Sequence, residues 1–211
     1  FNEKYRRTTI FVTGFWTCYA IAYYGITIYT PTILSEFNET GSRTIAYLGS
    51  GVVALVGLIG ALIGLNLADR WGRRPLIITS FAGLAVALLI LALTPTPGLG
   101  FLVALFSFAV LFANMGGGIL NFVYPTELYP TGVRATGMGF ATSVSRIGSI
   151  LGVLVFPGMI AAWGQQVALG FFFAVAVTAL IICVVMAPET KGQSLEVLAK
   201  EGDYEGELAH P

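Results

Sequence analysis

Two apolar runs joined by a short charged segment decide the fold: AYLGSGVVALVGLIGALIGLNL at residues 46–67, ADRWGRRP at 68–75 and LIITSFAGLAVALLILALT at 76–94. Neither run contains an acidic or basic residue. A helix rises about 1.5 Å per residue, so roughly 20 apolar residues cross a hydrocarbon layer of about 30 Å. The pattern therefore predicts two transmembrane helices connected by a charged turn.

The same pattern continues in both directions and predicts an all-α membrane protein, a bundle of six transmembrane helices. Of the 211 residues, 56% are hydrophobic and only 10% are charged, whereas about a quarter of residues are charged in soluble domains. The six predicted spans are residues 8–34, 46–67, 76–94, 100–124, 137–160 and 167–187. Within residues 1–191 these spans form one transmembrane unit, and residues 192–211 are predicted to be a solvated cytoplasmic tail. Because the chain begins at Phe1 rather than Met, we interpret it as a piece of a longer protein.

The basic residues alternate between the two ends of the predicted bundle. Nine of the eleven lie on one side, one (Arg43) lies on the other and one (Arg146) lies inside a span. The side rich in Lys and Arg is expected to be cytoplasmic. Both ends of this segment are then cytoplasmic, as an even number of spans requires. The nine residues are Lys4, Arg6, Arg7, Arg70, Arg73, Arg74, Arg134, Lys191 and Lys200.

Composition argues against several classes of protein. The formal net charge is zero, so nucleic-acid binding has no electrostatic support. Cys18 and Cys183 lie inside apolar runs, and the single histidine, His210, lies in the tail. An enzyme needs a nucleophile, base or metal constellation, and the spans contain no His, Asp or Glu that could form one. We therefore predict no catalytic residue, no metal and no cofactor, and we expect that the protein is not an enzyme.

Arg146 is the most informative single residue. It lies about ten residues into the fifth span, where a charge is costly and usually faces an interior cavity or a partner. As a substrate residue it would bind an anion, since guanidinium forms two parallel hydrogen bonds with a carboxylate. The structural alternative is that Arg146 pairs with backbone carbonyls or with a carboxylate outside this chain.

Polar and aromatic residues in other spans suggest a pocket around that arginine. Asn114 and Asn121 are seven residues apart in the fourth span, and Tyr19 and Tyr23 are four apart in the first. These spacings place each pair on one helical face. Three consecutive glycines at 116–118 weaken the fourth helix by about 1 kcal/mol each relative to alanine. We interpret them as a cavity-lining bend or a gating point.

Three segments carry a family resemblance. D-R-W-G-R-R at 69–74, P-T-E-L-Y-P-T-G-V-R-A-T-G at 125–137 and P-E-T-K-G at 188–192 occur in this order at three predicted cytoplasmic positions. They resemble signatures of the sugar-porter-like branch of the major facilitator superfamily. The resemblance covers essentially the whole chain. It implies the C-terminal half, helices seven to twelve, of a twelve-helix transporter whose two halves rock about a central site.

The resemblance also implies a conformational ion-pair network at the cytoplasmic helix ends. Its charges would hold one conformation and separate in the other. The same positive charges also anchor the topology, a role that overlaps with the network. The predicted members are Asp69, Arg70, Arg73, Arg74, Glu127 and Arg134.

The substrate class follows from where this sequence differs from sugar-transporting members. Their helix-ten tryptophan is Phe122 here, their helix-eleven asparagine and tryptophan fall on Ser145 and Arg146, and their helix-seven amides are Cys18, Tyr19 and Tyr24. The local sequence is more similar to the organic-ion and aromatic-acid transporter group. An arginine at the helix-eleven position is implicated in substrate binding in anion-transporting members, and that role is carried to Arg146 alone.

We therefore predict transport of a small organic anion, such as an aromatic carboxylate, by alternating access across the cytoplasmic or plasma membrane. Its partners would be that substrate, the lipid bilayer and an N-terminal six-helix half. The predicted substrate residues are Arg146, Asn114, Asn121, Tyr19, Tyr23 and Phe122. A sugar or polyol porter and a non-transporting membrane sensor are the alternatives. Proton coupling, as in a symporter, stays open because the carboxylates lie at the membrane edges.

Overall fold

The computed structural model describes residues 3–36, 43–94 and 98–192, with side chains from residue 5 onward. These residues form helices and connecting turns, with no strand among them. The predicted tail lies outside the described residues except for Gly192. In chain order the elements are α1 (Glu3–Glu36), α2 (Arg43–Trp71), α3 (Arg73–Leu93), α4 (Leu99–Phe112), the π-helix η1 (Ala113–Gly118), α5 (Ile119–Leu128), α6 (Thr131–Trp163) and α7 (Gln165–Met186).

Among the described residues six helical segments are long and apolar enough to cross a membrane, the fourth being α4, η1 and α5 together. The all-α bundle of six transmembrane-length helices is therefore confirmed. Each predicted span lies within one of these segments, except that Thr94 and Ala187 lie one residue beyond α3 and α7.

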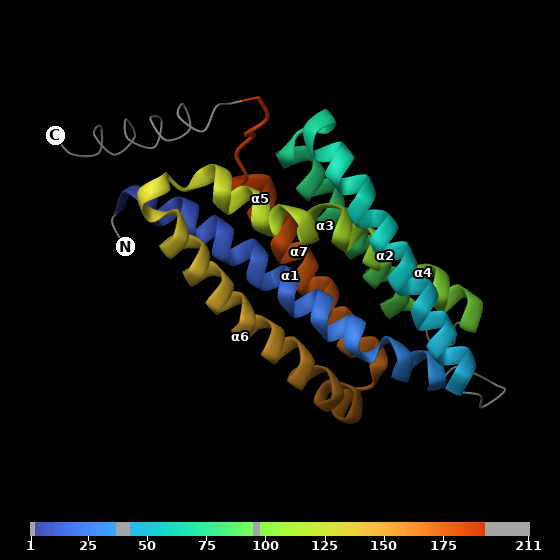
Figure 1. Cartoon of the computed structure of the whole chain (residues 1–211). Coiled ribbons are helices and arrows are strands. Elements are labelled where there is room, and N and C mark those ends of the chain that lie inside the picture. The colour runs from blue at the N-terminus through green and yellow to red at the C-terminus, as the bar shows by residue number, and fades with distance from the viewer. Residues whose placement is uncertain (1–2, 37–42, 95–97, 193–211) are drawn as a thin grey trace.

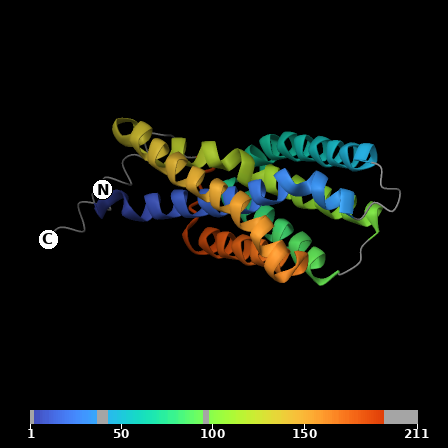
Figure 2. The ribbon, with the colours of Figure 1, turned by 90° about the horizontal axis from the view of Figure 1, so that it is seen from below.

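The helices run antiparallel, so the start of α1 and the end of α7 lie at the same end of the bundle (Figure 1). Hydrogen bonds at that end join distant parts of the chain: Tyr129 donates to the Thr9 hydroxyl at 3.0 Å, and Tyr124 donates to the Pro188 carbonyl at 3.0 Å. α1 packs along α6 and α7, α3 along α7, and α2 along α4 and η1. Both views show α1 and α6 side by side over most of their length (Figures 1 and 2).

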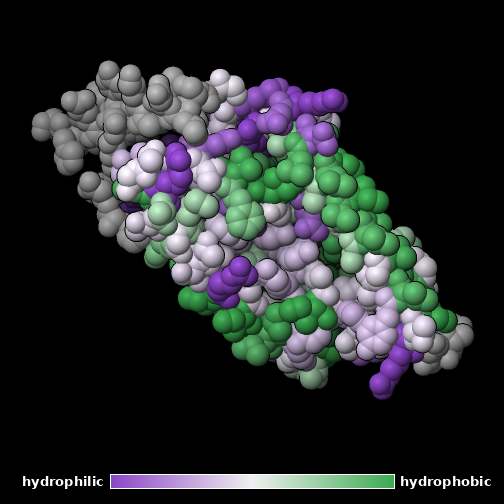
Figure 3. All heavy atoms as spheres, viewed as in Figure 1, coloured by the Kyte–Doolittle hydropathy of each residue, from purple (hydrophilic) through white to green (hydrophobic). Residues whose placement is uncertain are grey.

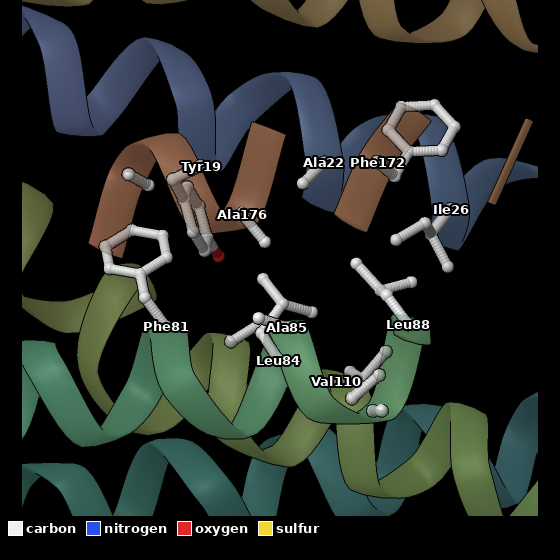
Figure 4. Packing of buried hydrophobic residues seen from close by; sticks show 14 of the residues in the cluster. Tyr19, Ala22, Ile26, Phe81, Leu84, Ala85, Leu88, Val110, Phe172 and Ala176 are labelled. Carbon is white, nitrogen blue, oxygen red and sulfur yellow. The ribbon is translucent and has the colours of Figure 1, made fainter. Parts of the chain in front are cut away.

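The hydrophobic core lies between α1, α3 and α7. Tyr19, Ala22 and Ile26 of α1 face Leu84, Ala85 and Leu88 of α3, with Phe172 and Ala176 of α7 beside them (Figure 4). At the end where α1 begins, Phe11 and Phe15 pack against the buried ring of Tyr124, with ring centroids 5.2 Å and 6.0 Å apart. Helices associate in lipid through such packing because burial from lipid gives no hydrophobic gain.

Glycines allow the closest helix contacts. A Cβ at Gly60 would overlap the backbone oxygen of Leu111, and one at Gly152 would overlap that of Ile21. The backbones of α2 and α4 therefore touch, as do those of α6 and α1. These contacts explain why glycines occur at four-residue spacing, Gly60 and Gly64 in α2 and Gly148 and Gly152 in α6.

The outer flanks of the bundle are apolar, whereas hydrophilic residues gather at the end where α2 finishes (Figure 3). α2, for example, exposes Leu48, Leu55 and Leu62 at seven-residue spacing. A monomeric protein in water rarely exposes a long apolar face. These flanks suit contact with lipid or with another set of transmembrane helices.

Candidate substrate pocket and charge network

A pocket of about 170 Å³ opens between α1, the η1–α5 segment and α6. All six residues predicted for substrate binding line it. The full lining consists of Trp16, Tyr19, Ala20, Tyr23, Tyr24, Asn114, Gly118, Asn121, Phe122, Ser145, Arg146 and Ser149. The structure thus brings the predicted residues together, although their binding role stays a prediction.

Aromatic rings form one wall of the pocket. Tyr19 and Tyr23 stack with centroids 5.1 Å apart and planes 13° apart, and Tyr24 meets Tyr23 edge-on at 5.5 Å. Trp16 and Phe122 meet edge-on at 5.5 Å. Stacked and edge-on pairs are the favoured arrangements of aromatic rings. The wall therefore presents both ring faces and ring edges to a flat ligand.

Arg146 is the only charged side chain among the described residues that line the pocket. Its Nη1 donates to the hydroxyl of Tyr24 at 3.3 Å, and the residue is otherwise exposed. A guanidinium has five N–H donors, so most of the donors of Arg146 have no partner among the described residues. No carboxylate pairs with Arg146 in the described part of the chain, which leaves its charge available to an anion.

The two asparagines occupy different environments. Asn114 donates from Nδ2 to the Val110 carbonyl at 3.1 Å and accepts at Oδ1 from the Tyr19 hydroxyl at 3.5 Å. Asn121 is only 2% exposed, and its Oδ1 has no hydrogen-bond partner among the described residues. An unpaired buried amide oxygen costs about 1–3 kcal/mol. Asn121 is therefore the less satisfied of the two.

The predicted set leaves out five side chains of the lining: Trp16, Ala20, Tyr24, Ser145 and Ser149. Trp16 lies three residues before Tyr19 and seven before Tyr23, and this spacing places it on their face of α1. Tyr24 falls where sugar-transporting members carry a helix-seven amide, and its tertiary contact with Arg146 places it in the pocket wall. Ser145 and Ser149 complete the α6 side of the pocket, and Ser149 shares the helical face of Arg146.

The three glycines at 116–118 lie in η1, at the pocket edge. π-Helical segments within α-helices are rare and often occur at functional sites. A Cβ at Gly117 would lie 2.5 Å from the ring of Tyr19, and one at Gly118 would lie 3.1 Å from its hydroxyl. The glycines therefore leave room for the Tyr19 ring, and the bend or gating role predicted for them stays a prediction.

The charge network at the end of the bundle centres on Arg73. Its Nε and Nη2 both donate to Oε1 of Glu127, at 3.1 and 2.9 Å, and its Nη1 donates to Oδ1 of Asp69 at 3.0 Å. The Arg73 and Glu127 side chains are each 16% exposed, whereas Asp69 is 79% exposed. Thr190 donates its hydroxyl to the second oxygen of Glu127. The network joins the ends of α2, α3 and α5 to the segment after α7.

Glu189 adds a contact that the sequence prediction did not include. Its carboxylate accepts hydrogen bonds from the backbone N–H groups of Arg73 at 2.9 Å and Arg74 at 3.1 Å. These are unpaired donors in the first turn of α3, where the helix dipole favours negative charge. The P-E-T-K-G signature at 188–192 contains this glutamate, but nothing in the local sequence indicates that its carboxylate caps α3.

The other predicted network residues make different contacts. Arg134 donates from Nε to the Tyr129 carbonyl at 3.1 Å, and Arg74 donates from Nη2 to the Val184 carbonyl at 3.1 Å. Arg70 contributes its carbonyl, which accepts from Nζ of Lys191 at 2.5 Å. Within the described residues the ion pairs are Asp69–Arg73 and Arg73–Glu127. The conformational role of the network stays a prediction.

Comparison with known proteins gives the family. The sugar (and other) transporter family matches residues 1–201. The chain is 31% identical over 204 residues to the inner membrane metabolite transport protein YgcS of Escherichia coli, covering 96% of this chain and 44% of that protein. It is 34% identical over 209 residues to a protein described as a probable 4-methylmuconolactone transporter of Cupriavidus pinatubonensis, covering 93% and 45%.

A solved structure shows the same fold. The proton:xylose symporter XylE bound to 6-bromo-6-deoxy-D-glucose, a major facilitator superfamily protein, aligns with a TM-score of 0.76 at 24% identity. The alignment covers 92% of this chain and 42% of that one. The chain thus spans less than half the length of each of these three proteins, as expected for one six-helix half. It belongs to the sugar (and other) transporter family of the major facilitator superfamily, whose members are multi-pass integral membrane proteins.

Proposed function

We propose that this chain is the C-terminal half of a secondary transporter for a small organic anion, a ring compound with a carboxylate. The observation that carries the proposal is Arg146, the only charged side chain among the described residues that line a pocket walled by aromatic rings. A charged group at this depth is costly and usually serves a substrate or a partner. The similarity to a probable 4-methylmuconolactone transporter supports a substrate that is a small ring compound.

The proposed binding mode uses three parts of the pocket. The Arg146 guanidinium forms hydrogen bonds with the carboxylate, in place of or beside its bond to Tyr24. The ring of the substrate packs against the stacked pair Tyr19 and Tyr23. Asn114 and Asn121 supply hydrogen bonds that orient the ring substituents.

The transport cycle requires a second half. We infer that an N-terminal six-helix half closes the open side of the pocket and that the two halves rock around it. The Arg73–Glu127 pair would hold the helix ends of this half together in one state and release them in the other. The excess of basic residues at this end supports its placement in the cytoplasm.

A sugar or polyol porter is the second candidate. It is favoured by Asn121, whose unpaired amide oxygen suits a hydroxyl donor. Against it, a neutral ligand would leave Arg146 without a counter-charge in the membrane interior.

The test is ligand binding to the full-length transporter purified in detergent. Thermal stabilisation is measured with benzoate, its neutral amide benzamide, D-glucose and D-xylose. We expect stabilisation by benzoate but not by benzamide, since only the acid pairs with Arg146. Arg146→Gln should weaken benzoate binding roughly 10- to 100-fold, the range for a hydrogen bond to a charged group.

Two further variants separate binding from folding. Arg146→Lys keeps the charge but not the two-pronged geometry, so its protein level should be normal while affinity falls. Arg7→Gln removes an exposed arginine of α1 outside the pocket and should leave binding unchanged. Stabilisation by the sugars alone would replace the anion proposal with the sugar-porter reading. Loss of Arg146→Lys protein from the membrane would make Arg146 a structural residue.

A further inference from the structure

A serine outside the pocket meets the interrupted part of the fourth transmembrane segment. Ser80 of α3 is fully buried, and its hydroxyl donates to the Phe112 carbonyl at 2.5 Å while accepting from the Gly117 backbone N–H at 3.1 Å. These two backbone groups are five residues apart, which is the separation that a π-turn joins. The Ser80 hydroxyl therefore lies at the closure of the π-turn.

The packing around this hydroxyl leaves little freedom. A Cβ at Gly116 would overlap the side chain of Ser80 and would lie 2.8 Å from the Leu76 carbonyl oxygen. On the opposite side of η1, a Cβ at Gly117 would lie 2.5 Å from the ring of Tyr19. The π-helix thus packs against α3, α1 and α2, whose Gly64 lies against the Met115 carbonyl oxygen, and Ser80 is its hydrogen-bonding contact on the α3 side.

The shape of η1 determines how the pocket amides face each other. A π-turn contains one residue more than an α-turn, and one residue corresponds to a rotation of about 100°. Asn114 lies inside η1 and Asn121 follows it on α5. Loss of the π-turn would therefore rotate Asn114 relative to Asn121 and would separate its Oδ1 from the Tyr19 hydroxyl.

We propose that Ser80 is a positioning residue: it maintains the π-helix and thereby sets the direction of Asn114 in the substrate pocket. The proposal rests on the proposed function only in taking this pocket as the substrate site, and it does not depend on whether the ligand is an anion or a sugar. The predicted effect is on affinity and selectivity, although Ser80 itself does not line the pocket.

A double-mutant cycle tests this link. Dissociation constants are measured by calorimetry on the full-length transporter, with benzoate and D-xylose as probes, for Ser80→Ala, Asn114→Ala and the double variant. We expect Ser80→Ala alone to weaken binding of the bound probe about fivefold, the range of one hydrogen bond. In the Asn114→Ala background the same change should weaken it less than about twofold, because coupled residues are not additive.

Matched controls separate positioning from general destabilisation. Ser107→Ala removes a buried serine of α4, in the transmembrane segment that contains η1, and its hydroxyl has no partner among the described residues, so binding should not change. A second cycle of Ser80→Ala with Tyr24→Phe should be additive, because Tyr24 contacts Arg146 rather than η1. If Ser80→Ala protein does not fold, Ser80→Cys, which keeps a weak donor, goes through the same cycle.

The outcomes are distinct from those for the anion proposal. Additive effects of the Ser80 variant and Asn114→Ala, or equal coupling to Tyr24, would overturn the positioning role. An unchanged affinity in Ser80→Ala would do the same. Failure of Arg146→Gln to affect benzoate binding would instead overturn the anion proposal and would leave the Ser80 result standing with D-xylose.

Discussion

Replacement of Glu127 by glutamine tests the charge network most directly. The carboxylate holds Arg73 by two hydrogen bonds of 3.1 and 2.9 Å and accepts a third from Thr190. Glutamine has nearly the same shape and keeps one acceptor oxygen, so Glu127→Gln removes the charge with little change in packing. Asp69→Asn makes the same chemical change on the other partner of Arg73.

The structure predicts different magnitudes for the two variants. Glu127 is 16% exposed, and hydrogen bonds to charged groups that are mostly buried contribute about 1.5–3 kcal/mol. Because Arg73 keeps its bonds to Asp69 and to the Ala68 carbonyl, we expect a loss of about 2 kcal/mol in Glu127→Gln. Asp69 is 79% exposed, so its pair contributes at most about 1 kcal/mol.

Thermal unfolding in detergent measures the difference. A loss of 2 kcal/mol corresponds to roughly 4–8 °C for a unit of this size, whereas Asp69→Asn should shift the midpoint by less than half as much. If the pair also holds one transport state, a cysteine placed in the pocket should change its labelling rate from the cytoplasmic side in Glu127→Gln only. Equal midpoint shifts for the two variants would refute the argument from burial.

Two further changes test contacts at the same end of the bundle. Gly72 has φ of +104°, and a Cβ there would lie 2.5 Å from the Glu189 carboxylate. Gly72→Ala should therefore destabilise the protein by about 1–3 kcal/mol. The control Gly98→Ala, at an open position with φ of −65°, should not. Equal thermal unfolding midpoints for the two variants would contradict this. Burial raises the pKa of the Tyr129 hydroxyl, although its bond to a threonine opposes the shift. A raised pKa adds stability that is present below the unfolded pKa near 10 and is lost as pH rises through the folded pKa. Tyr129→Phe should therefore flatten the alkaline decline of the thermal unfolding midpoint.

The helices could be predicted because a bilayer requires long apolar segments. In the hydrocarbon layer the backbone groups of runs such as 46–67 and 76–94 have no water to bond, so each run must form a helix. At the charged turn the helices extend beyond the predicted spans: α2 ends at Trp71 and α3 begins at Arg73, so Gly72 alone separates them. Its positive φ makes a sharp turn that a single sequence does not specify.

The candidate pocket could be predicted in part. Helical spacing placed Tyr19 with Tyr23, and the cost of a buried charge singled out Arg146. Tyr24 was not included, because only the packing of α1 on α6 brings it to the guanidinium. Ser80 gave no signal in the sequence, since a serine in a span commonly bonds its own helix and here it bonds another.

The sequence by itself determined the number of spans, the family and the side of the bundle that carries the charges. These follow from local properties: hydrophobic length, short signatures and the distribution of Lys and Arg. Only the tertiary structure decided which charges pair, since Arg73 reaches Glu127 across 54 positions of sequence while Arg134 bonds a carbonyl nearby. It also decided the π-helical form of residues 113–118, which pack against α2, α3 and α1 through close contacts at the glycines. Such contacts depend on distances between helices, which no local pattern of residues encodes.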